Sequence, residues 1–170
     1  MYNAYLQITN MPGESTDSKH KDWIELQGYE ISGMQQQAGK SISQGGALSA
    51  GRSEVKPFKI RKLIDKASPK IMEACLKGTH IEKITLSLSR QTGSKSGATE
   101  FYNYTISQAM VVGFTSAAHD EEESDKASSP LPYEEVEFVG VQHKWTYTET
   151  DTKGEKKGNT EAQYSMATNS

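Results

Sequence analysis

Three things are scarce in this sequence: cysteine, long apolar runs and an excess of charge of one sign. Cys75 is the only cysteine, which excludes an intramolecular disulfide scaffold and a cysteine zinc cluster. No apolar run approaches the roughly 18–20 residues of a membrane span, so we expect no membrane insertion. The formal net charge of -3 excludes a nucleic-acid reader that depends on excess basic charge.

The first residues also lack the features of a secretory signal peptide. They contain no basic segment followed by an apolar stretch of about 7–15 residues. Residues 1–8 alternate instead, with Tyr2, Ala4, Leu6 and Ile8 on one face of a predicted strand. We therefore expect a protein that begins in the cytoplasm, which leaves later export by a route without a signal peptide open.

What the sequence does contain is a repeated strand pattern. Apolar and polar residues alternate at about 23–36, 54–63, 83–89, 100–114 and 133–148. A change of phase near Gly140 predicts a bulge in the last of these strands. One domain of 170 residues is enough for a sizeable core. The class is mainly β: a two-sheet barrel or sandwich with one flanking helix.

One helix is predicted, at residues 67–78. Ser68 is a good N-cap, Pro69 a good first helical residue and Gly78 a good left-handed end. The predicted apolar face is Ile71, Met72, Cys75 and Leu76. A helix this short does not stand alone in water, so we expect it to dock on a sheet, with Cys75 as an inert core residue.

Polar segments separate these elements. Residues 10–22, 38–54 and 115–132 read as loops, and the last of these is acidic. Residues 149–170 show no periodic apolar face. We predict a disordered tail at 152–170 behind a single domain at 1–151.

The best candidate for catalytic chemistry is the segment Gly46–Ser53, which is one residue away from a phosphate-binding P-loop. Arg52 stands where the P-loop needs lysine, and a strand pattern containing Pro57 follows instead of a helix. The match is thus incomplete, and a nucleotide hydrolase is kept only as an alternative function. None of the four histidines (His20, His80, His119, His143) has metal-ligand spacing with another. We expect no catalytic residue, no cofactor and no metal site.

Aromatic residues form a second pattern, at Trp23, Tyr102, Tyr104, Trp145 and Tyr147. They could form a stacking platform for bases or sugars. Their spacing of two along predicted strands is explained more simply by a core or an interface.

Three ordered segments of the chain resemble a known family. They are Gly13–Asp17 with His20–Glu25; Asp65–Gly78 with His80, Ile81 and Thr85–Leu86; and Leu131–Phe138 with Trp145–Thr148. Together they resemble the haemolysin-coregulated protein (Hcp) family, the inner-tube protein of bacterial type VI secretion systems. The resemblance covers about residues 1–151.

The resemblance implies a β-barrel close to phage tail-tube proteins and homohexameric rings that stack into a tube. A contractile sheath would expel this tube, which would also contact spike and baseplate proteins and hold effector proteins in its lumen. The protein would be made in the bacterial cytoplasm and then secreted without a signal peptide. A stand-alone ring-forming effector carrier, chaperone or secreted binding module is the alternative.

The resemblance also places an extended loop at 38–54. This loop combines glycines with isolated apolar and charged residues, a mixture that suits a segment ordered by contact with a neighbour. We therefore predict that it mediates ring stacking. The residues proposed for this contact are Lys40, Ile42, Gly45, Gly46, Leu48 and Arg52.

Overall fold

The computed structural model describes residues 2–38, 50–91, 98–118, 132–151 and 156–168. The elements in these ranges are β1 (Tyr2–Ile8), β2 (Ile24–Glu30), β3 (Gln35–Ala38), β4 (Ala50–Glu54), β5 (Phe58–Leu63), α1 (Ser68–Lys77), β6 (Ile81–Gln91), β7 (Ala98–Ala117), β8 (Tyr133–Thr150) and β9 (Lys156–Ser165). The mainly β class and its flanking helix are confirmed.

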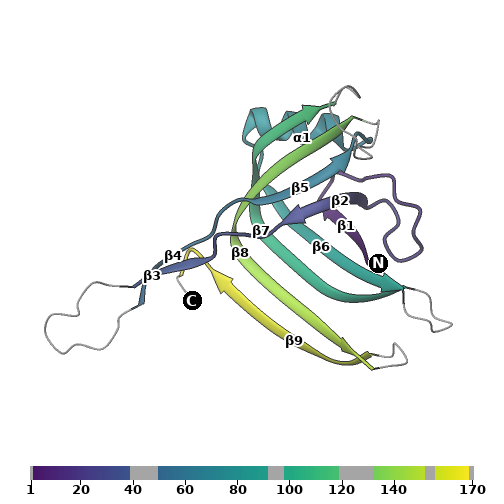
Figure 1. Cartoon of the computed structure of the whole chain (residues 1–170). Helices are drawn as coiled ribbons and strands as arrows, with labels where there is room; N and C mark the ends of the chain where they lie inside the picture. The colour runs from purple at the N-terminus through teal and green to yellow at the C-terminus, as the bar shows by residue number, and fades with distance from the viewer. Residues whose placement is uncertain (1, 39–49, 92–97, 119–131, 152–155, 169–170) are drawn as a thin grey trace, which may run out of the picture.

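The strands form one antiparallel sheet that closes on itself. Their order is β5-β2-β1-β6-β7-β8-β9, and β5 pairs with β8 as well as with β2. Six strands thus form a barrel, and β9 continues the sheet beyond it (Figure 1). The strands β3 and β4 form a separate two-stranded hairpin, which points away from the barrel.

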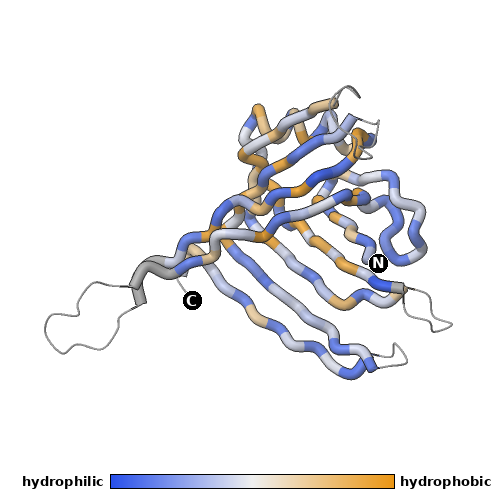
Figure 2. Tube along the Cα trace, viewed as in Figure 1, coloured by the Kyte–Doolittle hydropathy of each residue, from blue (hydrophilic) through white to orange (hydrophobic). Residues whose placement is uncertain are grey.

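The core lies inside the barrel, because alternate residues of each strand point to that side. In β1 the buried residues include Ala4, Leu6 and Ile8, as the alternation predicts. Apolar residues of the other strands and of α1 complete this cluster, among them Ile24, Phe58, Ile60, Ile71, Ile84, Leu86, Tyr104, Ile106, Val136 and Phe138. Figure 2 shows apolar residues gathered in the barrel strands, whereas β9 is mostly hydrophilic.

The inward-facing set changes phase in the middle of the two longest strands. In β8 it passes from Phe138 to His143 across Gly140, and in β7 it passes from Ile106 to Ala109. The predicted phase change is therefore confirmed. The register irregularity recorded for this strand pair lies at Val111/Gly113 and not at Gly140.

The helix ends as predicted but begins differently. Gly78 adopts φ 62, and its N–H bonds to the carbonyl of Ala74. The N-cap is Ala67 rather than Ser68, and the Ser68 side chain is buried in a polar cluster instead. The predicted apolar face is also wrong in part, because Met72 is 40% and Leu76 89% exposed. Ser68, Ile71 and Ala74 are the buried helix residues, with Cys75 partly buried against the core.

Four other segment predictions need correction. The strand predicted at 23–36 is divided into β2 and the start of β3, and the strand predicted at 54–63 begins at Phe58. Residues 115–117 belong to β7 and not to the acidic loop. The prediction of a disordered tail at 152–170 is wrong for residues 156–165, which form β9. This strand pairs with β8 over nearly its whole length, and local periodicity cannot reveal such pairing.

Candidate functional site

The predicted ring-stacking loop corresponds to the β3–β4 hairpin and its connection. Gln35 pairs with Glu54 at its base, where the Gln35 Nε2 donates to Glu54 Oε2 at 3.0 Å. The two ends of the predicted loop thus form a ribbon that extends from the barrel (Figure 1). Of the proposed contact residues, Arg52 lies in β4. The others, Lys40, Ile42, Gly45, Gly46 and Leu48, fall outside the described residues.

The same segment does not have the structure of a P-loop. A P-loop needs a helix directly after its glycine-rich turn, because the helix N-terminus binds the phosphate. Arg52 and Ser53 lie in β4, and the next element is β5. The nucleotide-binding alternative therefore lacks its structural context.

A second projecting element is formed by the outer half of β8 and by β9. Residues 142–150 of β8 pair with β9, whereas residues 133–138 pair with β5. We call residues 142–150 and 156–165 the β8–β9 extension. Residues 156–163 are exposed at every position, and β9 is the terminal strand of the described sheet. Sequence reasoning predicted the β8 part of this extension and missed β9, because β9 has no apolar alternation.

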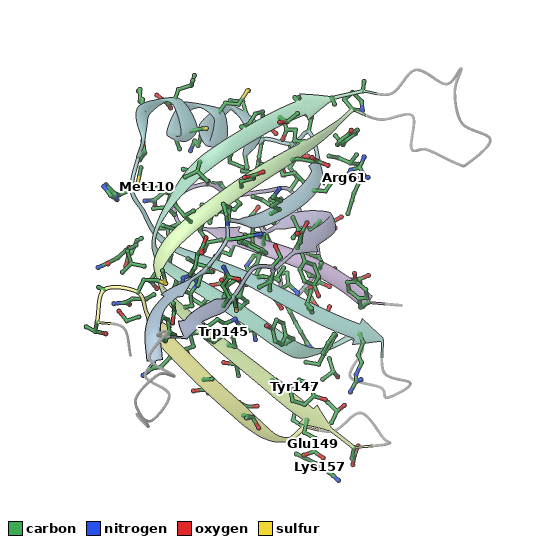
Figure 3. All side chains as sticks on the ribbon, turned by 60° about the vertical axis from the view of Figure 1, so that its left-hand side comes forward. Arg61, Met110, Trp145, Tyr147, Glu149 and Lys157 are labelled. Atoms are coloured by element: carbon green, nitrogen blue, oxygen red, sulfur yellow. The ribbon has the colours of Figure 1, made fainter. Side chains whose placement is uncertain are left out.

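The extension has one aromatic face. Trp145 and Tyr147 follow one another on it, with Glu149 further toward the tip of the strand (Figure 3). The Trp145 ring stacks on Tyr104, with centroids 5.8 Å apart, and Tyr147 pairs across the strands with Tyr102. The sequence prediction of a core or an interface fits this position, since the aromatic row starts in the core.

A buried polar cluster elsewhere has the distances of a serine-protease triad. His20 Nδ1 lies 2.9 Å from Asp17 Oδ1, and His20 Nε2 lies 2.9 Å from Ser87 Oγ. A nucleophilic serine must reach a substrate carbonyl. Ser87 is fully buried and its Oγ donates to Glu100 at 2.6 Å. The cluster therefore ties the loop after β1 to β6 and β7.

The electrostatics of this cluster agree with a structural role. Burial raises the pKa of the Asp17 carboxyl. The hydrogen bonds from His20 and from the backbone N–H groups of residues 19 and 20 outweigh that effect, so the pKa lies below its usual range. The Tyr5 ring stacks on His20 at 4.3 Å and fixes the imidazole further. The charged form of Asp17 thus holds the loop in place.

His143 is a second buried histidine and lies on the inner face of β8. Its Nδ1 lies 2.8 Å from the Tyr104 hydroxyl, and its Nε2 is buried without a hydrogen-bond partner in the described residues. Burial lowers the pKa of His143, and the Gly140 backbone opposes this shift in part. Beside it lies a cavity of about 30 Å³, also lined by Met166 and Gly140. This is room for one water molecule and not for a substrate.

Within the described ranges, no group of three or more histidine, cysteine, aspartate or glutamate side chains could hold a metal ion. Over the same ranges, no helix has the length and apolarity needed to cross a membrane. The predicted core residue Cys75 is a free thiol of intermediate exposure on α1.

Comparisons with known proteins point to the family that the sequence motifs resemble. A family model described as "Type VI secretion system effector, Hcp" matches residues 5–147. None of the curated proteins compared with the chain matches it.

Several solved structures share the fold, among them the following three. A chain described as "Structure of a type six secretion system protein" is 25% identical, with a TM-score of 0.84, and the match covers 100% of this chain and 99% of that one. Hcp1 from Salmonella typhimurium is 24% identical with a TM-score of 0.73, covering 99% and 97% of the two chains. A chain of a sheath-tube complex from an extracellular contractile injection system is 11% identical with a TM-score of 0.52, covering 95% and 89%.

Proposed function

The chain belongs to the Hcp family and is a tube component of the type VI secretion system, and we propose that it builds the tube from stacked homohexameric rings. The observation that carries this proposal is the pair of projections, the β3–β4 hairpin and the β8–β9 extension, on one closed barrel. A cyclic ring needs two different patches on each subunit, and a stack of rings needs a further contact. Two separate projections supply surfaces for both purposes.

The hairpin is the element that we assign to stacking. Its two strands extend from the barrel, and residues 39–49 connect them. Each contact of such a loop is weak, because fixing a residue costs about 1–2 kcal/mol of backbone entropy. Six loops acting together would make stacking cooperative.

The partners of the proposed tube are proteins. Rings of this chain would meet a spike at the tip of the tube, a baseplate at its foot and a contractile sheath around it, and would carry effector proteins in the lumen. The chain would leave the bacterial cytoplasm through the type VI system itself. A stand-alone ring that serves as an effector carrier, or a secreted binding module, remains the second candidate.

We also propose that the chain has no catalytic activity of its own. The constellation closest to an active site, Asp17–His20–Ser87, is buried, and its serine is occupied by Glu100. Saturable ATP hydrolysis that disappears on Arg52→Ala substitution would contradict this proposal.

Native mass spectrometry and electron microscopy of the purified chain test the assembly. The expected result is a sixfold species that forms rings, and tubes at high protein concentration. Rings that never stack, even together with a spike and a sheath, would favour the stand-alone carrier. A monomer at all micromolar concentrations would overturn the ring itself.

A further inference from the structure

The inward-facing rows of the barrel continue onto the β8–β9 extension. One row crosses the sheet from Leu88 on β6 to Tyr102 on β7 and Tyr147 on β8. Its exposure rises along this path: Leu88 is 4% exposed, Tyr102 is half-buried, and Tyr147 is 47% exposed. The next row behaves alike, from buried Tyr104 to partly exposed Trp145 and exposed Ala162. The inward-facing apolar surface thus continues past the barrel core onto β8 and β9, where the rest of the chain leaves it partly exposed.

The opposite face of the same strands is made of hydroxyl and amide groups. Its open part includes Thr105, Ser107, Gln142, Thr146 and Gln163, which neighbour one another across β7, β8 and β9. Lys144 and Glu161 form an ion pair on this face, with Nζ 3.0 Å from Oε2, and exposed Lys83 on β6 lies in register with Ser107. Thr105, Ser107, Gln142 and Gln163 also border a hollow of about 390 Å³. We call this surface the polar face, and the surface of Trp145 and Tyr147 the aromatic face.

The edge strand has little support from the chain itself. Every residue of 156–163 is exposed, and the outer edge of β9 is the end of the described sheet. β9 is an edge strand that pairs with β8 alone in the described sheet. A free edge also presents unpaired N–H and C=O groups to another chain.

We infer that the neighbouring copy in the ring covers the aromatic face and the β9 edge, and that the polar face lines the lumen. This inference rests on the proposed ring assembly, and it decides which way the sheet faces in that ring. A second copy is the occupant because a tube subunit meets copies of itself on both sides, through heterologous contacts. Half-buried aromatic rings next to an open strand edge are the surface that such a contact buries.

The assignment has a consequence for the cargo. A wall rich in threonine, serine and glutamine side chains stays hydrated. The lumen would therefore suit hydrophilic effector proteins. It would hold them through hydrogen bonds and water rather than through apolar contact.

Two adjacent residues give a matched test, because Thr146 and Tyr147 point to opposite faces of β8. Each is replaced by lysine, so both variants carry the same added charge. We expect Tyr147→Lys to abolish the ring in native mass spectrometry, and Thr146→Lys, beside Glu161, to retain it. The reverse pattern, or rings from both variants, would overturn the inference. Circular dichroism of the monomers checks that both variants fold.

Cysteine labelling gives a readout that does not depend on breaking the ring. In a Cys75→Ala background, Thr146→Cys and Tyr147→Cys are each treated with a small maleimide, as monomers in dilute solution and as assembled rings. Both cysteines should react as monomers, whereas assembly should slow labelling at position 147 and leave position 146 reactive. Protection at 146 with free reaction at 147 would place the aromatic face in the lumen.

The wild-type chain distinguishes failure of the proposed ring from failure of the proposed sheet orientation. If it forms no ring, the proposed function fails and the orientation of the sheet no longer applies. If it forms rings that both lysine variants retain, the ring stands and the assignment of the aromatic face is wrong.

Discussion

Lys62 Nζ donates to Glu134 Oε2 at 2.7 Å, and both side chains are shielded from solvent inside the barrel. The two residues are register partners on β5 and β8, the pair of strands that closes the barrel. Ser68 and Asp65 join them, with Ser68 Oγ 2.9 Å and Asp65 Oδ1 2.9 Å from the ammonium group. The cluster thus fixes the start of α1 to the closure of the barrel.

Removing one partner of this pair should be strongly destabilising. A buried pair that loses one member leaves an uncompensated charge, which typically costs about 3–5 kcal/mol. Because Asp65 still contacts Lys62, we expect Glu134→Gln to fall near the lower end of that range in urea unfolding.

The matched control lies on the same two strands. Lys59 and Glu137 are also register partners, 3.1 Å apart, but their side chains are 48% and 38% exposed. Solvent screens such a pair, so Glu137→Gln should leave the unfolding midpoint nearly unchanged. Equal effects of the two variants would show that the buried pair has no special role.

His143 should make the folded state sensitive to acid. Burial holds its pKa below the unfolded value of about 6.5, so the unfolded chain binds a proton first as the pH falls. Stability is then lost below about pH 6.5, by at most about 1.4 kcal/mol per pH unit. Urea unfolding between pH 7.5 and 5.5 should show a smaller loss for His143→Gln than for the wild type. His80→Gln, at an exposed position, should keep the wild-type profile.

Gly140 should not tolerate a side chain. A Cβ at this position would overlap with Cγ2 of Ile106 and would lie 3.2 Å from the Ser107 carbonyl oxygen. Overpacking of a core typically costs about 1–3 kcal/mol, and we expect that loss for Gly140→Ala in thermal or urea unfolding. Gly158→Ala is the control, since no heavy atom lies within 4 Å of its added Cβ. A stable Gly140→Ala protein would mean that β7 and β8 can move apart there.

The hairpin connection should be needed for tubes and not for rings. Replacing residues 39–49 with a short glycine–serine linker keeps β3 and β4 and removes five of the proposed contact residues. We expect hexamers in ultracentrifugation and no tubes in electron microscopy. The same replacement at 119–131 is the control and should leave tubes intact. If the 39–49 variant is monomeric, this segment belongs to the ring interface. If it forms normal tubes, the stacking hypothesis is wrong.

The local sequence determined the elements whose signals are local. Pro69 and Gly78 bracket α1 because a missing N–H and a left-handed φ suit only the two ends of a helix. Alternation of apolar residues likewise identified β1, β6 and β8, and the three family motifs identified the kind of protein. The strand at Arg52 was missed, because the glycine-rich segment 38–54 favoured a loop.

Tertiary structure decided whatever depends on a distant partner. β9 has no apolar pattern and exists because β8 offers it an edge, and Ser68 left the helix cap because Lys62 and Glu134 lie beside it. The sequence pattern placed Ile71 and Leu76 on one apolar face of α1, yet Ile71 is buried and Leu76 faces solvent. Which apolar row of a strand or helix is covered depends on where the barrel closes, and that closure joins β5 to β8 across some seventy residues of chain.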